Sequence, residues 1–457
     1  MNQHIKPIES EVDLAEELLA ALAGGDAARL DAFFSKLSLS EALRELLQLA
    51  PDERRIVLTL ISPEIAADLV EEAPHEVGAD LMEHLETDRA VEIMEELDSD
   101  VQADLIGDME PEEAEAILGQ MDAEDAADVR RLSEYDDETA GGLMMSEVFE
   151  CADTMTVSDV IKVLAKDDDD VDRYRGQHPY IINSEGKLVG VVSLRGLLAT
   201  KRSALLTTFM ADPMTVQADT ALSDLEDIFD KYDFLGVPVV DSDGRLLGVV
   251  SRDAVSQALL ERQESENLKL QGVVGDELRS MPTWLRSRRR LAWLSANIVL
   301  NMIAASVISA YEETLLAVIA IAVFLPMVSD MSGCSGNQAV GVTMRELSLG
   351  LVRPKDAFKV WVKEISVGVI NGIALGILIG IVAWIWKGSP ALGLVIGAAL
   401  ALNTMLAVSI GGVVPLLLKR IGQDPAVASG PLLTTVTDMA GFFFVLSLAT
   451  LMMPWLV

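Results

Sequence analysis

Two aspartates, Asp330 and Asp438, lie within or beside long apolar stretches in the second half of the chain. A charged side chain at the centre of a bilayer costs about 2.5–3.5 kcal/mol on insertion scales, so it usually faces water, a partner or an ion. No Lys or Arg occurs between Leu432 and Val457 to neutralise Asp438. We therefore predict that Asp438 faces a cation pathway. The alternative is an aspartate that is protonated or hydrogen-bonded within helix packing.

Small and polar residues surround both aspartates. Thr434 and Gly441 share the helical face of Asp438, and Thr435 borders that face. Asp330 begins a short stretch that is rich in Gly and Ser. Irregular backbone at membrane depth is tolerated where it lines a water-filled cavity. For Asp330, the sequence leaves open both a wet cavity and a helix end at the membrane interface.

The charge of the chain is divided unevenly between its two halves. Up to Leu285 the chain has 64 acidic and 23 basic residues, whereas from Arg286 onward it has 8 acidic and 12 basic residues. An anionic soluble part is therefore joined to a hydrophobic part. Such a part repels nucleic acid and anionic lipid and attracts cations, divalent ones above all. We expect a cation as substrate, regulator or both, and no nucleic-acid partner.

A twelve-residue repeat runs from Ser62 to Leu132, and Leu69, Leu81 and Ile93 are among its recurring apolar residues. Each unit opens with Pro, Asp, Glu or Ser and continues with apolar residues at helical spacing, which is typical of a short capped helix. Short helices cannot bury their apolar faces alone, so they stack. The repeat predicts an acidic, all-α superhelical domain over residues 1–140, with an ordinary helical bundle as the alternative.

A strand–turn–strand pattern follows from about Met144. Two short apolar runs flank the turn at Asn183–Gly186, which predicts a hairpin. The pattern recurs 58 residues later, around Gly244, and each hairpin follows an amphipathic helix. This duplication resembles a tandem CBS (cystathionine-β-synthase) pair, which implies an α/β domain pair over residues 141–261.

The CBS resemblance also bears on a nucleotide cofactor. In that family a carboxylate after the second strand often holds a nucleotide ribose. The corresponding stretches here are Ser193-Leu194-Arg195-Gly196 and Ser251-Arg252-Asp253-Ala254. Neither stretch keeps the family pattern in full, so the sequence argues against ATP as a cofactor.

The rest of the chain predicts a connecting helix and a membrane domain. Residues 262–285 are charged and compatible with a helix until Pro282; a force-transmitting gating helix and a passive linker are both open. The five-helix transmembrane domain is expected over residues 286–457, because five apolar stretches are long enough to span a bilayer. The stretches are Leu291–Ala310, Leu315–Val328, Ile365–Trp386, Leu392–Leu418 and Leu432–Val457.

Basic residues predict the orientation of these spans. Lys and Arg cluster at Arg286–Arg290, between Arg345 and Lys363, and at Lys419 and Arg420. Such clusters mark cytoplasmic loops. The N-terminal domains are therefore expected in the cytoplasm and the C-terminus outside.

Enzyme activity is not expected. The four histidines, His4, His75, His84 and His178, all lie in the first half of the chain. No HExxH pair, nucleophile elbow or phosphate loop accompanies them. The two cysteines, Cys151 and Cys334, lie in different halves, so no disulfide framework is predicted.

Taken together, these features resemble the MgtE family of magnesium channels and transporters over essentially the whole chain. The order of the parts matches, from acidic helical domain through CBS pair and connecting helix to five spans. The residues that carry the resemblance are Phe324-Leu325-Pro326, Asp330-Met331-Ser332-Gly333, Gly336-Asn337-Gln338, Asp424-Pro425-Ala426, Ala428-Ser429-Gly430-Pro431, Thr434-Thr435 and Asp438.

The resemblance implies a homodimer in the bacterial inner membrane, in which the second and fifth spans line a central pore. It implies that Asp438 recognises Mg2+ there, and we expect Thr435, Asn337 and Asp330 at the same metal site. Cys334 and Gly430 depart from the asparagines of some relatives. The expected partners are a second copy, Mg2+ and membrane lipid.

The resemblance further implies gating, in which cytosolic Mg2+ bound among acidic surfaces closes the pore. Magnesium dehydrates reluctantly, so a pore should hold it with few direct ligands and with its waters retained. Facing carboxylates repel one another unless divalent cations bind between them and favour the compact state. The candidate regulatory ligands are Asp98, Asp100 and Asp104 on the helical domain, Asp224 and Asp233 on the second CBS copy, and Asp253 and Glu266 at the linker.

Two alternatives keep the membrane location and change the function. Oxygen ligands favour hard cations but do not separate magnesium from manganese, so transport of another divalent cation, such as cobalt or manganese, is open. A membrane cation sensor without transport is the other alternative. A sensor does not need an unpaired acid such as Asp438 in its last span.

Overall fold

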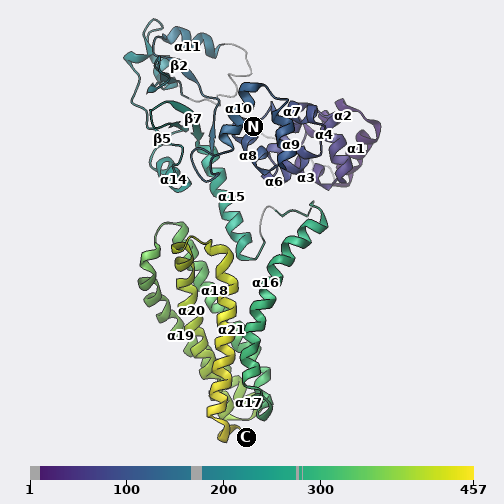
Figure 1. Cartoon of the computed structure of the whole chain (residues 1–457), viewed down its shortest axis with the longest axis vertical. Coiled ribbons are helices and arrows are strands. Elements are labelled where there is room, and N and C mark those ends of the chain that lie inside the picture. Colours follow the sequence, from purple (N-terminus) through teal and green to yellow (C-terminus); the bar gives the residue numbers. More distant parts are fainter. Residues whose placement is uncertain (1–10, 166–177, 274–276, 280) are drawn as a thin grey trace, which may run out of the picture. The chain divides into compact units, whose positions relative to one another are not determined.

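The computed structural model describes residues 11–165, 178–273, 277–279 and 281–457. The chain divides into two compact units, Met1–Arg262 and Gln263–Val457 (Figure 1). Each unit has hydrophobic clusters of its own. The first unit combines helices with two small sheets, and the second unit consists of helices.

Short helices fill the N-terminal part of the first unit, as the twelve-residue repeat predicts. Leu69, Leu81 and Ile93 are all buried, which confirms the interpretation of the repeat as the core of a helical domain. Prolines and capping side chains begin many of these helices, and Ser62 accepts a hydrogen bond from the backbone N–H of Ile65. The helices are α1 (Glu11–Gly24), α2 (Ala27–Phe34), α3 (Leu39–Gln48), α4 (Pro51–Leu60), α5 (Pro63–Glu71), α6 (His75–Glu83), α7 (Thr87–Met94), α8 (Ser99–Asp108), α9 (Pro111–Leu118) and α10 (Ala123–Leu132).

The packing order of these helices is regular. Helix α5 packs against α7, α6 against α8, α7 against α9, and α8 against α10. Each helix from α5 to α8 thus contacts the helix two places further along the chain, which is the arrangement of a stacked helical repeat. Gly78 on α6 allows one close approach, because a Cβ there would lie 2.9 Å from Leu105 Cδ2 on α8.

Two sheets form the CBS part and confirm the duplication. One sheet has the strand order β2-β3-β4 and the other the order β1-β7-β6-β5. The predicted hairpins are β3–β4 and β6–β7, and Gly186 and Gly244 adopt φ values of +76° and +80° in their turns. The elements are β1 (Met144–Met145), β2 (Glu150–Ala152), α11 (Val157–Leu164), β3 (Tyr180–Ile182), β4 (Leu188–Val191), α13 (Leu194–Ala199), η1 (Leu206–Thr208), β5 (Val216–Gln217), α14 (Leu222–Lys231), β6 (Gly236–Val240) and β7 (Leu246–Ser251).

The connecting segment differs from the single helix expected over residues 262–285. Helix α15 runs from Arg252 to Leu270, so it begins earlier and ends earlier than expected. Gly272 follows with a φ of +77°, a conformation that ends a helix. The next helix, α16 (Thr283–Ala310), begins directly after Pro282. Glycine and proline therefore divide the segment into two helices.

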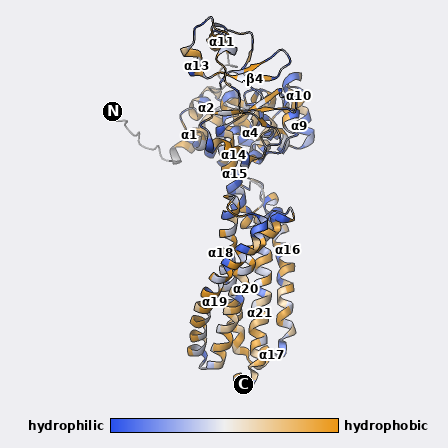
Figure 2. Cartoon of the chain, turned by 90° about the vertical axis from the view of Figure 1, so that its left-hand side faces the viewer, coloured by the Kyte–Doolittle hydropathy of each residue, from blue (hydrophilic) through white to orange (hydrophobic). Residues whose placement is uncertain are grey.

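Five helical segments of the described residues are long and apolar enough to cross a membrane, which confirms the predicted count. In Figure 2 hydrophobic residues dominate these helices, whereas hydrophilic and hydrophobic residues are mixed in the first unit. The segments are Thr283–Ala310, Ile319–Ser348, Pro354–Lys387, Pro390–Arg420 and Gly430–Leu451. The helices of the second unit are α16, α17 (Glu312–Ala317), η2 (Ile319–Val323), α18 (Leu325–Ser348), η3 (Pro354–Asp356), α19 (Ala357–Lys387), α20 (Pro390–Arg420), α21 (Pro425–Leu451) and α22 (Met453–Leu456).

The second span is longer than the apolar stretch Leu315–Val328 predicted. Helix α18 starts at Leu325 and continues through the Gly- and Ser-rich stretch to Ser348. Pro326 lies in the first turn of α18, where a helix tolerates proline. Asp330 lies on continuous helix, so its interpretation as a helix end is wrong, and the stretch that begins at Asp330 is regular helix rather than irregular backbone.

Glycines bring α19 and α20 close together. A Cβ on Gly372 would lie 2.7 Å from the carbonyl oxygen of Ala401, and one on Gly380 would lie 2.8 Å from that of Gly393. Helix packing in membranes favours such small residues, because they let two backbones approach. Helix α20, which this contact joins to α19, also packs against α18 and α21.

Candidate functional site

A cavity of about 570 Å3 lies among α16, α18 and α21. Both aspartates singled out from the sequence line it, Asp330 from α18 and Asp438 from α21. The complete lining consists of Ile308, Ala322, Leu325, Pro326, Ser329, Asp330, Gly333, Cys334, Asn337, Thr434, Asp438 and Phe442.

Asp438 is half-buried and has a neighbour on the opposite helix. The hydroxyl of Ser329 donates a hydrogen bond to Oδ1 of the Asp438 carboxylate. Within the described part of the chain, no ion pair involves Asp438 or Asp330. Both carboxylates therefore lie at the cavity without a basic side chain to balance them.

Helical spacing explains why the polar residues of α18 meet at one cavity. Asp330, Cys334 and Asn337 follow one another at intervals of one helical turn, so they share a face of α18. All three are exposed in the single chain. Thr434 lies one turn before Asp438 on α21 and contributes to the opposite wall. The cavity thus presents two carboxylates, one amide, hydroxyls and one thiol.

One predicted pore residue lies elsewhere. Thr435 is not among the lining residues, and its hydroxyl donates to the carbonyl oxygen of Pro431 on its own helix at 2.8 Å. Ser329 and Thr434 line the cavity, and the role of Thr435 at the metal site stays a prediction. Position on the face of Asp438 already distinguishes Thr434 in the sequence. Ser329 gives no such signal, because its contact with Asp438 depends on how two helices pack.

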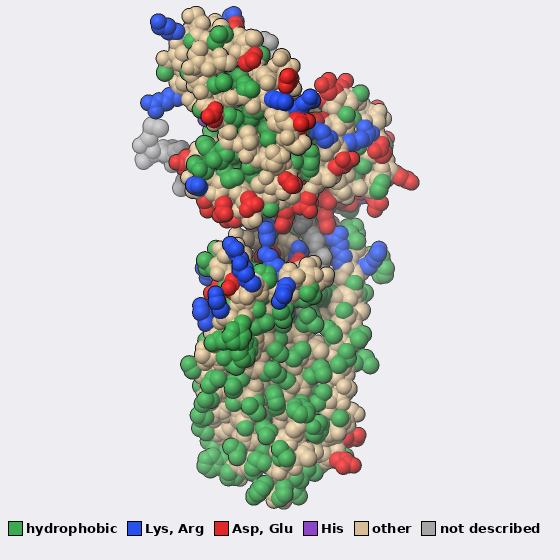
Figure 3. Space-filling view, turned by 60° about the vertical axis from the view of Figure 1, so that its left-hand side comes forward, with side chains coloured by type: hydrophobic (Ala, Val, Ile, Leu, Met, Phe, Trp, Pro, Cys, Tyr) green, Lys and Arg blue, Asp and Glu red, His purple; other side chains and the backbone are tan. Residues whose placement is uncertain are grey.

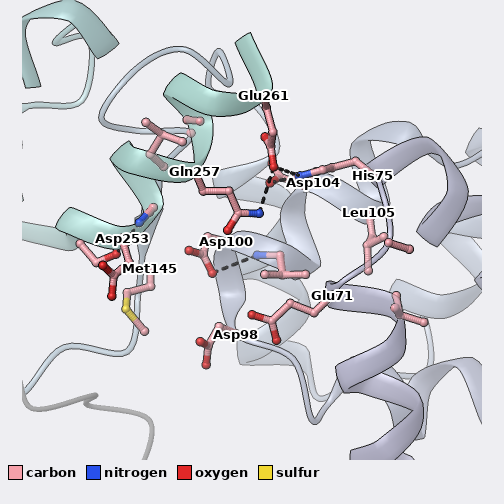
Figure 4. A pocket seen from close by; sticks show the side chains of 18 residues that line it. Glu71, His75, Asp98, Asp100, Asp104, Leu105, Met145, Asp253, Gln257 and Glu261 are labelled. Carbon is pink, nitrogen blue, oxygen red and sulfur yellow. Dashed lines mark hydrogen bonds and ion pairs between the residues drawn. The ribbon is translucent and has the colours of Figure 1, made fainter. Parts of the chain in front are cut away.

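A second acidic site lies in the first unit, where α6 and α8 face the start of α15 (Figure 4). Four predicted regulatory ligands line this pocket of about 120 Å3, together with residues that the sequence did not single out. The four are Asp98, Asp100, Asp104 and Asp253; the additional charged or titratable residues are Glu71, His75 and Glu261.

His75 lies between two of these carboxylates. Its Nδ1 is 3.3 Å from Oδ2 of Asp104, and its Nε2 is 3.8 Å from Oε1 of Glu261. The carboxylates of Glu261 and Asp104 raise the pKa of His75 to about 9, so its ring is charged at neutral pH. Burial raises the pKa of Asp104 to about 7, and the nearby Asp100 carboxylate acts in the same direction. The pocket thus contains an internal cation among its acids.

The other three predicted regulatory ligands do not line this pocket. Asp224 lies in the first turn of α14 and is exposed. Asp233 follows the end of α14 and is also exposed. Glu266 lies on α15 beyond the Arg262 boundary, in the second unit.

Family models match three successive parts of the chain. Residues 37–138 match the MgtE intracellular N domain, and residues 140–202 and 206–261 match the CBS domain. Residues 325–448 match the MgtE model, which is described as a divalent cation transporter. The matched parts follow the order that the sequence predicts.

Curated proteins also resemble this chain. A protein named magnesium transporter MgtE from Thermus thermophilus is 33% identical over 335 residues, which cover 72% of this chain and 73% of that protein. The protein of the same name from Enterococcus faecalis is 31% identical over 331 residues, which cover 72% of each chain. A crystal structure of the soluble part of a magnesium transporter matches at 24% identity with a TM-score of 0.50, covering 55% of this chain and 99% of that one. On these matches, the chain belongs to the MgtE family of divalent cation transporters.

Proposed function

We propose that the protein moves Mg2+ across the bacterial inner membrane along a pathway that passes Asp438. The observation that carries this proposal is the pair of carboxylates, Asp330 and Asp438, at a cavity of about 570 Å3 among the membrane helices. Unbalanced acids at this depth are unfavourable unless they face water or an ion. The curated relatives named magnesium transporters support the choice of ion.

A hydrated ion fits this cavity better than a bare one. A single chain offers two carboxylates to a metal ion, and the other groups of the lining that could coordinate it are neutral oxygens and one thiol. Mg2+ keeps several of its waters in protein sites and is usually held by one or two carboxylates. Asn337 and Thr434 are then placed to hydrogen-bond water of the hydration shell rather than the ion itself.

We propose that the active form is a homodimer. Asp330, Cys334 and Asn337 are exposed on α18 of the single chain, although they lie on a membrane-spanning helix. A second copy that brings its own α18 and α21 against this face would enclose these polar side chains around a shared pathway. Such an arrangement doubles the number of carboxylates without a change in sequence.

The orientation proposed here places the first unit in the cytoplasm and the C-terminus outside. Figure 3 shows Lys and Arg at one end of the membrane helices and hydrophobic side chains over most of the remaining face. Basic residues mark the end of α18, η3 and the last turn of α20, which all belong to that end of the bundle. Excess Lys and Arg is typical of cytoplasmic loops.

Gating by cytosolic Mg2+ is part of the proposal, with the pocket of Asp98, Asp100, Asp104 and Asp253 as the regulatory site. Its carboxylates come from α8 and from the start of α15, so a divalent cation bound between them favours the compact state. The far end of α15 reaches the membrane helices. Leu270 packs with residues of α18 and α21, and Nζ of Lys269 is 3.2 Å from Oδ2 of Asp424.

A second candidate function is transport of a softer divalent cation such as Co2+. Cys334 favours this candidate, because its thiol lines the same cavity as Asp438. Sulfur ligands select softer metals, whereas carboxylates and water suit Mg2+.

Ion uptake into liposomes that contain the purified full-length protein tests the proposed function. We expect Mg2+ uptake above that of protein-free liposomes, and we expect high Mg2+ on the side of the first unit to reduce it. Uptake of Co2+ without uptake of Mg2+ would contradict the proposed function and support the second candidate. No uptake of any divalent cation would contradict both and favour a sensor.

A further inference from the structure

We propose that Asn403 on α20 is a positioning residue, which holds Asp438 and Ser329 in place from behind the cavity. The inference rests on the proposed function, because it assigns the geometry of Asp438 to a residue that does not line the cavity. Nothing in the sequence distinguishes Asn403 from the other small and polar residues of its apolar helix. Its role follows from the contacts of its side chain.

The Asn403 amide spans the two helices that carry the cavity residues. Its Nδ2 donates to the carbonyl oxygen of Thr437 on α21 at 3.0 Å and to that of Val328 on α18 at 3.5 Å. Thr437 immediately precedes Asp438, and Val328 immediately precedes Ser329. One amide group therefore ties together the backbone positions next to both members of the Ser329–Asp438 hydrogen bond.

Burial shows that this amide is not a surface group that happens to reach a carbonyl. Asn403 is fully buried, and so are Thr437 and Val328. Among the described residues, Oδ1 of Asn403 has no hydrogen-bond partner. A buried amide with an unsatisfied oxygen is unfavourable compared with an apolar side chain of similar size. Leucine would fill this position without that cost, but it could not bond to α18 and α21.

The neighbouring backbone makes room for the amide. Gly441 lies on α21 one helical turn beyond Asp438, and a Cβ there would lie 2.7 Å from Nδ2 of Asn403. The same Cβ would lie 3.6 Å from Cα of Ser329. A larger residue at Gly441 would therefore displace Asn403 or separate the two helices. Gly441 and Asn403 form a matched pair, in which the missing side chain of one admits the amide of the other.

Loss of the amide should alter how Asp438 meets the ion rather than whether the helices form. Asp438 and Ser329 lie on different helices, so their relative position depends on the contact between α18 and α21. A binding site that is displaced by a fraction of an ångström binds its ligand less tightly and selects less well among ions of different size. We therefore expect a higher half-saturating Mg2+ concentration and a weaker preference for Mg2+ over the larger Ca2+.

The test compares Asn403→Leu and Asn403→Asp with the control Thr404→Val in liposomes that contain the full chain. Asn403→Leu keeps the number and branching of the side-chain heavy atoms but removes the amide, and Asn403→Asp keeps the shape but removes the N–H donors. Thr404 is the next residue of α20, is equally buried, and has a hydroxyl without a partner among the described residues. We expect both Asn403 variants to raise the half-saturating Mg2+ concentration about tenfold, with Thr404→Val close to the wild type.

A double-mutant cycle links the effect to Gly441. We expect Gly441→Ala to raise the half-saturating Mg2+ concentration in the wild type, because its methyl group displaces the amide. In an Asn403→Ala background the methyl group has room, so Gly441→Ala should cause little further change. Additive effects of the two substitutions would contradict a contact between these residues.

A second measurement does not require transport or full activity of the variants. Cys334 lines the same cavity, so Mg2+ bound there should slow its modification by a positively charged thiol reagent. We expect Asn403→Leu to need about ten times more Mg2+ for half-protection than the wild type, and Thr404→Val to need the same concentration.

If the Asn403 variants need the same Mg2+ concentrations as the wild type for half-saturation of uptake and for half-protection of Cys334, the positioning role is overturned. The proposed function would then stay intact. Wild-type protein that shows neither Mg2+ uptake nor Mg2+ protection of Cys334 would overturn both. Protection without uptake would contradict transport alone, and the half-protecting concentrations of the variants would still decide the role of Asn403.

Discussion

The hydroxyl of Ser329 on α18 donates a hydrogen bond to the carboxylate of Asp438 on α21. The two residues are far apart in the sequence, and both line the cavity. The bond engages Oδ1 of the carboxylate and fixes its orientation relative to α18. A neutral donor leaves the charge of a carboxylate unbalanced and available to a cation, whereas an ion pair with Lys or Arg would balance that charge.

Ser329→Ala should weaken Mg2+ transport without preventing insertion. A hydrogen bond to a charged group contributes about 1.5–3 kcal/mol, so its loss should raise the half-saturating Mg2+ concentration at least about tenfold. The matched control is Ser332→Ala on the same helix, because the Ser332 hydroxyl donates to its own helix at Val328. Uptake assays on both variants in liposomes measure the difference. An equal half-saturating Mg2+ concentration in Ser329→Ala and Ser332→Ala would show that the hydrogen bond from Ser329 does not position Asp438.

A charged thiol reagent should block Mg2+ uptake through Cys334. Cys334 is exposed and lines the cavity, whereas Cys151 is buried in the CBS part. Modification adds bulk and positive charge beside Asp438, so it should exclude a cation. We expect block in the wild type and in Cys151→Ser, and no block in Cys334→Ser. Full uptake after complete labelling of Cys334, confirmed by mass spectrometry, would place the pathway elsewhere.

His75→Gln should loosen the contact of α6 and α8 with α15 when Mg2+ is scarce. With a pKa of about 9, His75 is protonated at neutral pH and separates Asp104 from Glu261. Removing this cation leaves the carboxylates to repel one another, and added Mg2+ should compensate. Protease cleavage of α15 at low and high Mg2+ measures the effect, with His84→Gln on the same domain as the control. Identical cleavage of both variants at low Mg2+ would contradict a role for His75 in this contact.

Paired acid substitutions separate the regulatory pocket from other acids. Asp100→Asn with Asp253→Asn removes two carboxylates that line the pocket. We expect this pair to raise the Mg2+ concentration that reduces uptake by half about tenfold or more. Asp224→Asn with Asp233→Asn is the matched control, because it removes the same charge from exposed positions outside the pocket. A larger effect of the control pair would move the regulatory site to the α14 surface.

The sequence is most informative where one local pattern repeats. Leu69, Leu81 and Ile93 recur every twelve residues, and their burial follows from helical periodicity alone. The two CBS hairpins are predictable because the same local pattern, two apolar runs joined by a glycine-containing turn, occurs twice in the sequence. The pairing of β1 with β7 is not predictable in this way, because Met144 and Met145 join a sheet whose other strands come from the second copy. The bounds proposed for the domains stay predictions.

The candidate site is predicted in part, and the failures have a common cause. Asp438 and Asp330 are prominent because a charge at membrane depth is unfavourable, wherever the helices pack. Ser329 and Asn403 become prominent only when three helices are assembled. Likewise, His75, Asp104 and Glu261 lie on three different helices, and no spacing rule connects them. Helix α18 continues through Gly333 and Gly336, so packing overrides the low helix propensity of glycine in this stretch.

Mg2+ uptake by Asp438→Asn in liposomes tests the central claim most directly. The substitution keeps the shape of the side chain and removes its charge. Two unit charges about 4 Å apart interact by about 4 kcal/mol at an effective dielectric constant of 20, so uptake should fall about a hundredfold or more. Glu313→Gln is the control, because Glu313 is an exposed acid of α17 that does not line the cavity. We predict near-complete loss of uptake in Asp438→Asn and wild-type uptake in Glu313→Gln. Wild-type uptake by Asp438→Asn would contradict the assignment of the pathway to this cavity.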